Sequence, residues 1–371
     1  MNSTLRKLEQ LKTLMELSSL INSSLDPAEI RKRAIEAAMK LAEAEAGSLI
    51  LADQESGDLF FEVALGDKGN MVKEVRIKKG HGISGWVAEK GECIIIDDVQ
   101  SDPRFYKIPD VKSKFKTKNM VCVPVKSKDR VLGVLEAINK KKGVFSDDDK
   151  EILSAFANQV AIAIENANLY QELKDTFYST AEALAETIEK RDHYTGGHTR
   201  RVMNYSMMIG ESIGLSKKDL EDLRLAAILH DVGKIGVSDD VLLKRGRLNR
   251  EEFEKMVLHS KYGAEILGHI RYLKDVIPGV RGHHERFDGK GYPDNLKNDD
   301  IPVIAKIIAV ADTFDAITSE RAYRDALSAE NALKELKMNS GIQFDEVIVD
   351  TFINLYQEQR FTVSSSGKNA G

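Results

Sequence analysis

The side chains with the clearest capacity for chemistry are histidines and acids gathered in the second half of the sequence. All but one of the eight histidines fall between His193 and His284. Two pairs of donors are adjacent in the chain, His230-Asp231 and His283-His284. Imidazole nitrogens and carboxylate oxygens are ligands that divalent transition metals accept, and such ions support chemistry on phosphoryl groups. A lone histidine would more often be a surface or core residue, but the joint pattern predicts a metal centre.

Other donors accompany these pairs. His259 lies between them, and Asp312 follows the apolar run 304–311. An unpaired carboxylate is costly to bury in such a place, so a cation is expected to hold Asp312. The alternative interpretation of Asp312 is an N-cap for residues 313–315. His269 lies on a predicted helical segment that matches no motif and is interpreted as structural.

The bulk composition limits the class of protein. A chain of 371 residues exceeds one ordinary core, so two domains are expected. Its net charge of −5 argues against a partner that is a nucleic-acid polymer. We find neither a membrane span nor a signal peptide, and the two cysteines, Cys93 and Cys122, follow no metal or redox spacing. These features predict a cytoplasmic protein that has no disulfides and no membrane partner.

The first part of the chain alternates helical and strand-like segments. Residues 5–46 are predicted to form two helices, with Asp26-Pro27 as the start signal of the second. Strands are expected at 48–52, 59–65, 72–77, 93–96, 120–125 and 131–138. Residues 80–87 are predicted to form a loop that runs into a short helix. Helices around a largely antiparallel sheet make an α+β sensor-like module.

A long helix is predicted after this module, because no proline or glycine occurs from Asp147 to about Lys190. Apolar residues recur every three or four positions, at Leu153, Phe156, Val160, Ala163, Ala167, Tyr170, Phe177, Ala181, Leu184 and Ile188. Lys174 alone interrupts this seam. The spacing predicts a coiled-coil connector and a homodimer formed through it. The alternative is a long helix packed on its own domain.

The second half of the chain resembles the HD phosphohydrolase superfamily. His198, His230-Asp231 and Asp312 look like the H…HD…D signature of that superfamily. The segments HDVGK at 230–234 and HHERFDGKGYP at 283–293 resemble the two name-giving motifs of the HD-GYP family. Residues 312–318, followed by Arg321, Tyr323 and Arg324, fit the C-terminal pattern of the family. The likeness runs from about Glu182 to Phe361 and implies an all-α HD-type bundle that hydrolyses cyclic di-GMP.

The same resemblance implies a set of metal ligands. One ion would be held by His198, His230, Asp231 and Asp312, and a second by His259, His283 and His284. Asp231, the expected catalytic carboxylate, would bridge the two ions. In this family the metals are typically iron, with manganese as the competitor. Glu189 and His193 are four residues apart and would share a helix face, so they predict a third ion or else an ordinary exposed pair.

Basic and aromatic side chains complete the expected site. Lys234, the second expected catalytic residue, would contact a non-bridging phosphate oxygen or a metal-bound water. Arg321 and Arg324 would grip phosphate from one helix face, or would form a solvated face. Lys290 and Tyr292 belong to the glycine-rich GYP turn at the rim of the site. Tyr292 would pack against a guanine or an adjacent helix, or serve a structural role.

Residues 14–168 resemble a GAF domain, a small-molecule and redox sensor module. The carriers are GHGISGWV at 80–87, DDV at 97–99, MVCVPV at 120–125 and GVLEAINK at 133–140. Asn139-Lys140, Phe145 and Asp149 partly match the motif of cyclic-nucleotide-binding members, but Lys150 stands where that pattern has Glu. The expected loss of a Lys–Glu clasp argues against a cyclic nucleotide. An unknown small ligand and a purely dimerising domain both stay open.

These features predict four regions along the chain. They are a GAF sensor domain at 1–150, a coiled-coil linker helix at 151–190, an HD-GYP phosphodiesterase domain at 191–362 and a disordered tail at 363–371. The expected reaction is metal-dependent hydrolysis of cyclic di-GMP to linear pGpG, with GMP as a possible further product, under control of the GAF domain. The alternatives are an HD hydrolase of another nucleotide and a catalytically silent cyclic-dinucleotide receptor that docks a partner protein.

Overall fold

The computed structural model divides the chain into two compact units, residues 1–174 and 175–371. It describes residues 3–53, 55–65, 75–128, 130–191, 197–244, 246–319, 326–358 and 360–361. The predicted tail at 363–371 lies outside these ranges. Helix α5 (Asp147–Glu189) contributes to both units. Its length and its first residue confirm the long helix predicted from the absence of glycine and proline.

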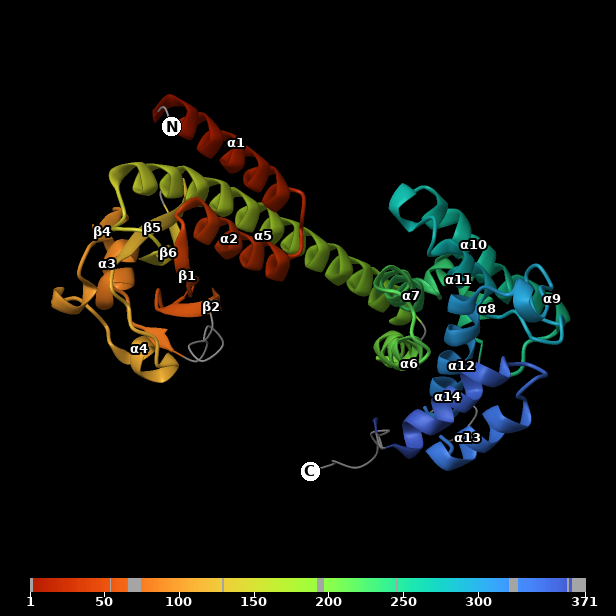
Figure 1. The fold of residues 1–371 in the computed structure, drawn as a ribbon. Helices are drawn as coiled ribbons and strands as arrows, with labels where there is room; N and C mark the ends of the chain where they lie inside the picture. The colour runs from red at the N-terminus through yellow and green to blue at the C-terminus, as the bar shows by residue number, and fades with distance from the viewer. Residues whose placement is uncertain are drawn as a thin grey trace. The chain divides into compact units, whose positions relative to one another are not determined.

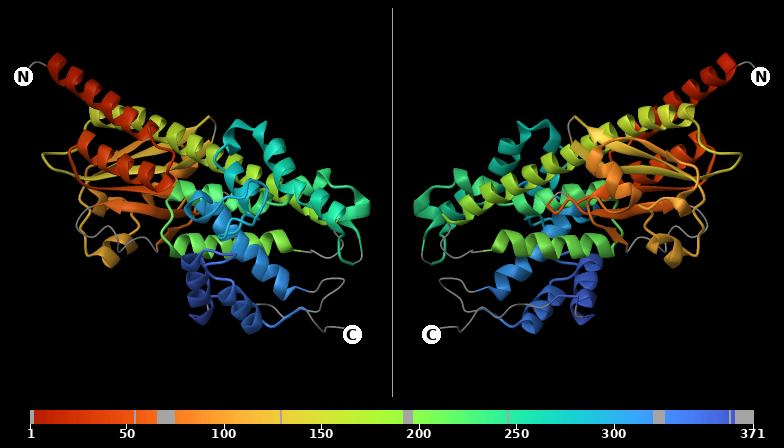
Figure 2. Two further views of the ribbon diagram at one scale, coloured as in Figure 1. Left: turned by 90° about the vertical axis from the view of Figure 1, so that its right-hand side faces the viewer. Right: turned by 90° about the vertical axis from the view of Figure 1, so that its left-hand side faces the viewer.

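The first unit is built on one antiparallel sheet. The strands are β1 (Ala44–Ala52), β2 (Leu59–Leu65), β3 (Arg76–Ile77), β4 (Ile94–Ile96), β5 (Met120–Ser127) and β6 (Arg130–Lys140), in the order β3-β2-β1-β6-β5-β4. Helices α1 (Ser3–Asn22), α2 (Pro27–Leu41) and α5 lie on one side of the sheet, while α3 (Gly82–Lys90) and α4 (Ile108–Ser113) lie on the other (Figures 1 and 2). The predicted α+β architecture is confirmed.

Alternation along strand β5 explains why the sheet is covered on both faces. Val121, Val123 and Val125 belong to the core shared with α2 and α5, whereas Met120 and Cys122 belong to the core beneath α3. Successive residues of a strand point to opposite faces, so an almost continuous apolar run can fill two cores. Both cysteines are free thiols, as the spacing predicted.

The start of the sheet corrects one helical prediction. Asp26 is the N-cap of α2, as predicted, and its carboxylate accepts hydrogen bonds from the backbone of Ala28 and Glu29. The helix does not continue to about Ala46, however, because it ends at Leu41 and β1 begins at Ala44. Pairing of β1 with both β2 and β6 overrides the helical preference of this alanine- and glutamate-rich segment.

The apolar seam of α5 is buried within each unit. Leu153, Phe156, Val160, Ala163 and Ala167 belong to the core of the first unit. Ala181 lies in the core of the second unit, with Phe177 and Ile188 packed against it. Most of the seam therefore matches the alternative interpretation, a long helix packed on its own domains, since periodicity alone does not identify the surface that covers a helix.

Position 150 supplies no carboxylate to Lys140, as predicted, but an acid one residue earlier takes that role. Lys140 at the end of β6 forms a buried ion pair with Asp149 in the first turn of α5, at 2.7 Å between Nζ and Oδ1. Asp149 also accepts hydrogen bonds from the backbone and hydroxyl of Ser146. Lys150 instead pairs with the exposed Asp147. The carboxylate that holds Lys140 thus comes from position 149.

The second unit consists of helices around a core centred on α12. Its longer elements are α6 (His198–Ser212), α7 (Lys217–Leu229), α10 (Leu258–Gly268), α12 (Val303–Thr318), α13 (Ala329–Met338) and α14 (Glu346–Gln357). The short ones are η3 (Val232–Gly236), α8 (Asp239–Leu242), α9 (Arg250–Met256), η4 (Arg271–Leu273), α11 (Ile277–Gly282) and η5 (Asn298–Asp300). Because α12 continues through residue 312, the N-cap interpretation of Asp312 is wrong.

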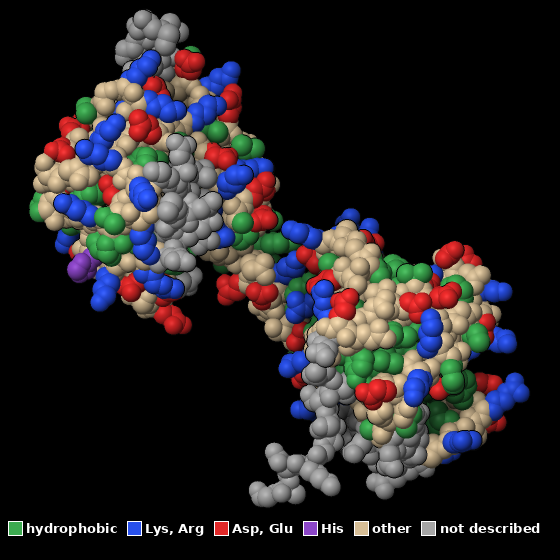
Figure 3. Space-filling view, turned by 60° about the horizontal axis from the view of Figure 1, so that its bottom comes forward, with side chains coloured by type: hydrophobic (Ala, Val, Ile, Leu, Met, Phe, Trp, Pro, Cys, Tyr) green, Lys and Arg blue, Asp and Glu red, His purple; other side chains and the backbone are tan. Residues whose placement is uncertain are grey.

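Charged side chains of both signs are interspersed over the face of the molecule drawn in Figure 3, in keeping with the small net charge of −5. Within the described ranges, no helix combines the length and the apolar character that a membrane crossing requires.

The buried clasp in the first unit gives a prediction on stability. Replacing one partner of a buried ion pair leaves an uncompensated charge, so Asp149→Ala should lower the free energy of unfolding of this unit by about 3–5 kcal/mol. The exposed control Asp147→Ala should change it by less than about 1 kcal/mol. Urea denaturation followed by the fluorescence of Trp86, the one tryptophan of the chain, reports on this unit. Equal stability of the two variants would contradict the buried clasp.

Candidate metal centre

Two groups of donors come together in the second unit. His259, His283 and His284 form one group, and His198, His230 and Asp231 form the other. Within each group the ligand atoms lie within 4.8 Å of one another. Residues far apart in the sequence thus converge as the adjacent pairs predicted.

The carboxylate of Asp231 lies between the two groups. Its Oδ1 is 3.5 Å from Nε2 of His259, and its Oδ2 is 3.5 Å from Nε2 of His230. The Nε2 atoms of His259 and His283 are 3.4 Å apart. These distances make one continuous cluster of donors with a carboxylate at its middle.

Backbone hydrogen bonds fix the orientation of three imidazole rings. The Nδ1–H groups of His230, His259 and His283 donate to the carbonyl oxygens of Ala227, Met256 and Val280, at 2.7, 2.7 and 2.6 Å. A carbonyl only accepts, so the unprotonated nitrogen of each ring is Nε2. Within the described part of the chain, the buried Nε2 of His230 has no hydrogen-bond partner. Such an orphaned atom fits a metal ligand.

Burial keeps three of the histidine donors neutral. It lowers the pKa of His283 to about 3, with the neighbouring His230 and His259 acting in the same direction. Burial also lowers the pKa of His284 well below its ordinary value, and that of His259. A neutral imidazole offers its lone pair to a cation at physiological pH.

Asp231 keeps its charge despite its burial. Burial alone would raise its pKa, but the ammonium of Lys234, 2.6 Å from Oδ2, outweighs this effect and holds the pKa well below its usual range. An ionised carboxylate flanked by neutral imidazoles is the charge pattern that a divalent cation neutralises.

Asp312 reaches the second group through His198. Oδ1 of Asp312 lies 3.4 Å from Nε2 of His198. Burial would lower the pKa of His198, but the hydrogen bond from Nδ1 to Asp315 and the charge of Asp312 outweigh it, so the pKa is raised. Asp315 in turn binds Arg201. Asp315 and Arg201 were not among the predicted site residues; the signal for Asp315 in the sequence is that it follows Asp312 by about one helical turn.

Close backbone packing accounts for the glycine in the first motif. A Cβ atom on Gly233 would lie 1.8 Å from the carbonyl oxygen of His259 and 2.4 Å from the amide nitrogen of Gly263. Only glycine therefore allows η3 to pack on α10 at this distance. The contact brings His259 to Asp231, two residues before Gly233.

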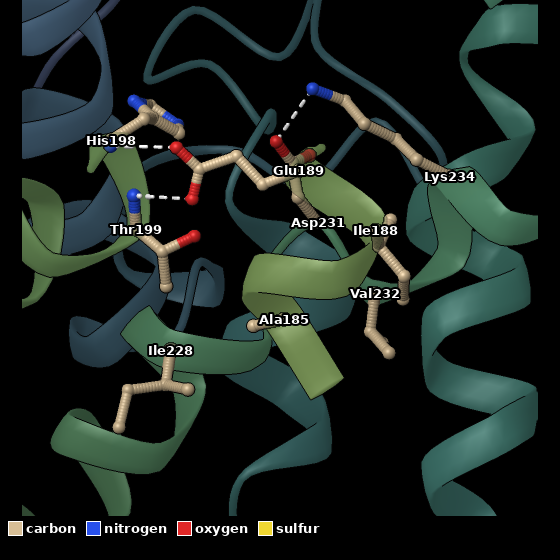
Figure 4. Close-up of a pocket in the computed structure, with 9 residues that line it drawn as sticks. All are labelled: Ala185, Ile188, Glu189, His198, Thr199, Ile228, Asp231, Val232 and Lys234. Carbon is tan, nitrogen blue, oxygen red and sulfur yellow. Dashed lines mark hydrogen bonds and ion pairs between the residues drawn. The ribbon is translucent and has the colours of Figure 1, made fainter. Parts of the chain in front are cut away.

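Glu189 lies beside this centre at the end of α5. Its carboxylate accepts hydrogen bonds from the backbone N–H groups of His198 at 2.8 Å and Thr199 at 3.4 Å, in the first turn of α6. Figure 4 shows these contacts beside the Lys234–Asp231 pair in one pocket. His193, the other predicted ligand of a third ion, lies outside the described residues.

The GYP segment borders the cluster. The ring of Tyr292 lies 4.8 Å from that of His284 and contacts Phe253 of α9 edge to face at 6.1 Å, between centroids. Burial raises the pKa of the Tyr292 hydroxyl. Buried Glu285 shapes the segment by accepting hydrogen bonds from the backbone of Asp294 and Leu296.

Two of the four basic residues predicted to bind phosphate lie within the described ranges. Lys290 is exposed on the GYP segment, and Lys234 lines the pocket beside Asp231. Arg321 and Arg324 lie outside the described residues. Taken together, the donor types, the neutral imidazoles and the orphaned Nε2 atom fit divalent metal ions.

Comparison with known families agrees with this arrangement. Residues 182–348 match the HD domain family, and residues 24–165 match the GAF domain family. The HD domain implies that the chain binds divalent metal.

Named relatives match rather more than half of the chain. A cyclic di-GMP phosphodiesterase of Thermotoga maritima is 39% identical over 191 residues, covering 51% of this chain and 52% of the relative. The cyclic di-GMP phosphodiesterase response regulator RpfG of Xanthomonas campestris pv. campestris is 37% identical over 204 residues, covering 54% of each chain. The 3'3'-cGAMP-specific phosphodiesterase 2 of Vibrio cholerae is 34% identical over 215 residues, covering 57% of this chain and 41% of the relative. The chain spans about half the length of the curated relatives it matches.

Metal content tests the cluster without any substrate. His283→Ala removes a donor, so we expect its Mn²⁺ binding to be weaker by about 100-fold or more, since loss of an outer-shell partner alone typically costs about 10–100-fold. His269→Ala, at an exposed helix end, is the matched control and should bind as the wild type does. Equilibrium dialysis with elemental analysis measures both, and circular dichroism checks folding. Equal metal content in the two variants would exclude His283 as a ligand.

Proposed function

We propose that this chain, in which a GAF domain precedes an HD domain, is a metal-dependent phosphodiesterase of the HD-GYP type that opens cyclic di-GMP to linear pGpG. The observation that carries the proposal is the ionised carboxylate of Asp231, placed among the imidazoles of two donor groups. Two relatives are named as cyclic di-GMP phosphodiesterases, which supports cyclic di-GMP as the substrate. Whether hydrolysis continues to GMP is a question for product analysis.

The donors of the centre are proposed to hold two metal ions. We assign the first ion to His198, His230, Asp231 and Asp312, and the second to His259, His283 and His284, with Asp231 shared. When bound, such ions activate water and neutralise charge that develops on the phosphoryl group. We propose iron as the native metal, with manganese as the competitor, and a third ion at Glu189 and His193.

Lys234 and the rim residues would handle the substrate. The ammonium of Lys234 pairs with Asp231 at the pocket, so it can exchange part of that contact for a non-bridging phosphate oxygen. We assign Arg321 and Arg324 to the second phosphate, because guanidinium groups bind phosphate bidentately. Lys290 and Tyr292 would border the nucleotide, with the Tyr292 ring offering a face to a guanine base.

A cyclic dinucleotide with one adenine is the second candidate substrate. It is favoured by the 34% identical relative named as specific for 3'3'-cGAMP. Both substrates carry the same 3′–5′ phosphodiester bonds, so the metal centre treats them alike. Discrimination must come from residues that contact the bases.

An assay on both dinucleotides tests the proposed reaction. We expect the chain, reconstituted with Fe²⁺ or Mn²⁺, to convert cyclic di-GMP to pGpG, with products resolved by chromatography. Asp231→Asn should lower kcat by about 10³-fold or more, because the loss of a single electrostatic group in an active site can cost about 10²–10³. The matched control, Asp102→Asn in the GAF domain, should retain full activity.

Three outcomes of this assay would decide against the proposal. Preference for 3'3'-cGAMP would move the substrate to the second candidate. Full activity of Asp231→Asn would remove the metal mechanism. Failure to hydrolyse either dinucleotide, with metal and ligand bound, would favour a silent receptor.

We further propose a homodimer formed through an exposed face of the first unit. On α5, Ile162, Leu169 and Leu173 are 46%, 56% and 68% exposed, at spacings of seven and four residues. On α1, Leu8, Leu11 and Met15 are also exposed at helical spacing. These residues of α1 and α5, on the same side of the sheet, form an apolar stripe. Its heptad-like spacing favours pairing with the same stripe of a second copy. A small ligand of the GAF domain would act on the metal centre through α5.

The oligomeric state checks this stripe. The double change Leu169→Glu with Leu173→Glu places charges in the exposed apolar stripe, so we expect the dimer to dissociate to a monomer. Val111→Glu, on the exposed part of α4 across the sheet, is the control and should leave the dimer intact. Sedimentation velocity distinguishes the two species. A wild type that sediments as a monomer would contradict the dimer outright.

A cytoplasmic location is part of the same proposal. Its support is that both cysteines, Cys93 and Cys122, are free thiols. Reduced thiols are the rule in that compartment.

A further inference from the structure

One histidine of the metal centre is held differently from three of the others. Three rings donate Nδ1–H to a carbonyl three residues earlier in the chain, at Ala227, Met256 and Val280. His198 is the first residue of α6, so no earlier turn of that helix can offer it a carbonyl. Its Nδ1 lies instead 2.7 Å from Oδ2 of Asp315. The ring is thus oriented by a side chain from another helix, α12.

Asp315 is buried and is held by hydrogen bonds from Arg201. The residue is 1% exposed. Its Oδ1 accepts a hydrogen bond from Nε of Arg201 at 2.6 Å, and its Oδ2 accepts one from Nη2 of the same guanidinium at 3.0 Å. The hydroxyl of Ser319 binds the guanidinium at 3.1 Å. A buried carboxylate is costly unless it is paired, and this bidentate contact provides the pairing.

Asp312 and Asp315, both on α12, lie next to opposite nitrogens of the His198 ring. Asp312 and Asp315 are three residues apart and therefore share a helix face. Oδ1 of Asp312 lies 3.4 Å from Nε2 of His198, while Asp315 accepts the hydrogen bond from Nδ1. With the proton held on Nδ1, the lone pair of Nε2 faces the carboxylate of Asp312. Both groups can then serve one cation.

We propose that Asp315 is a positioning residue for the metal centre: it fixes His198 in the tautomer whose Nε2 binds metal, and Arg201 holds Asp315 in that role. The inference rests on the proposed ligand set and goes beyond it, because neither residue belongs to that set. A carboxylate behind an imidazole ligand also raises the basicity of the ring, which strengthens its bond to the metal.

The isosteric change Asp315→Asn tests the role. An amide can turn either its oxygen or its N–H₂ group toward Nδ1, so it no longer enforces the tautomer. We expect Mn²⁺ binding at the ion assigned to His198 to weaken by about 10–100-fold, and binding at the ion assigned to His259, His283 and His284 to stay unchanged. Calorimetric titration of the full chain resolves the two. Asp102→Asn, which breaks a comparable bidentate arginine pair in the first unit, is the matched control.

A second readout reports the tautomer directly. With ¹⁵N-labelled histidine and diamagnetic Zn²⁺, the wild type should show His198 protonated on Nδ1 and metal-bound through Nε2. Asp315→Asn should populate the opposite tautomer. A purely structural role for Asp315 would leave the tautomer unmoved or weaken both ions equally, and either result would overturn the inference.

The outcomes separate this inference from the proposed function. A wild type that binds no Mn²⁺ would overturn the metal centre, and the role of Asp315 with it. Normal binding in Asp315→Asn would overturn only the role of Asp315. If circular dichroism shows that this variant is unfolded, Arg201→Lys decides, because the Arg201 side chain is 38% exposed. Weaker binding of one ion in Arg201→Lys supports the inference, and unchanged binding overturns it.

Discussion

The partial burial of an ionised carboxylate among imidazoles is the constraint on which the second unit depends. The rings of His230, His259 and His283 lie at the end of α7, in α10 and at the end of α11, and each is tied by Nδ1–H to a carbonyl three residues earlier. The helices therefore cannot shift without moving the donors. Charge of this kind is expensive to bury, and a divalent cation is the partner that offsets the cost. The cation that stabilises this unit would therefore also be the ion that supports its chemistry.

Local patterns predicted much of this architecture. The absence of glycine and proline located α5, and Asp26-Pro27 located the start of α2. Two adjacent donor pairs were enough to predict that distant segments converge, because such pairs have few other uses. These are features whose physical cause lies within a few residues of chain.

Other features depend on contacts that periodicity does not encode. The seam of α5 was visible, but the sequence could not say that the chain's own cores would cover most of it. Pairing between strands turned residues after Leu41 from helix to sheet. The hydrogen bond between Arg201 and Asp315 joins positions 114 residues apart, and neither residue stands in a donor pair.

Helix α5 belongs to both units of the chain. The GAF domain places an apolar stripe on α1 and α5, while the C-terminal turns of α5 bring Glu189 to the backbone of His198. One helix thus begins in the sensor fold and ends against a residue assigned to the metal. A change in the first unit that altered this helix would act on a ring whose other contacts are with Asp312 and Asp315.

Anomalous diffraction from crystals grown with Mn²⁺ tests the central claim most directly. The account predicts two manganese peaks on either side of the Asp231 carboxylate, one within bonding distance of His198, His230 and Asp312 and the other of His259, His283 and His284. Peaks that leave Asp231 without a metal bond, or an absence of manganese from this cluster at saturating concentration, would contradict it.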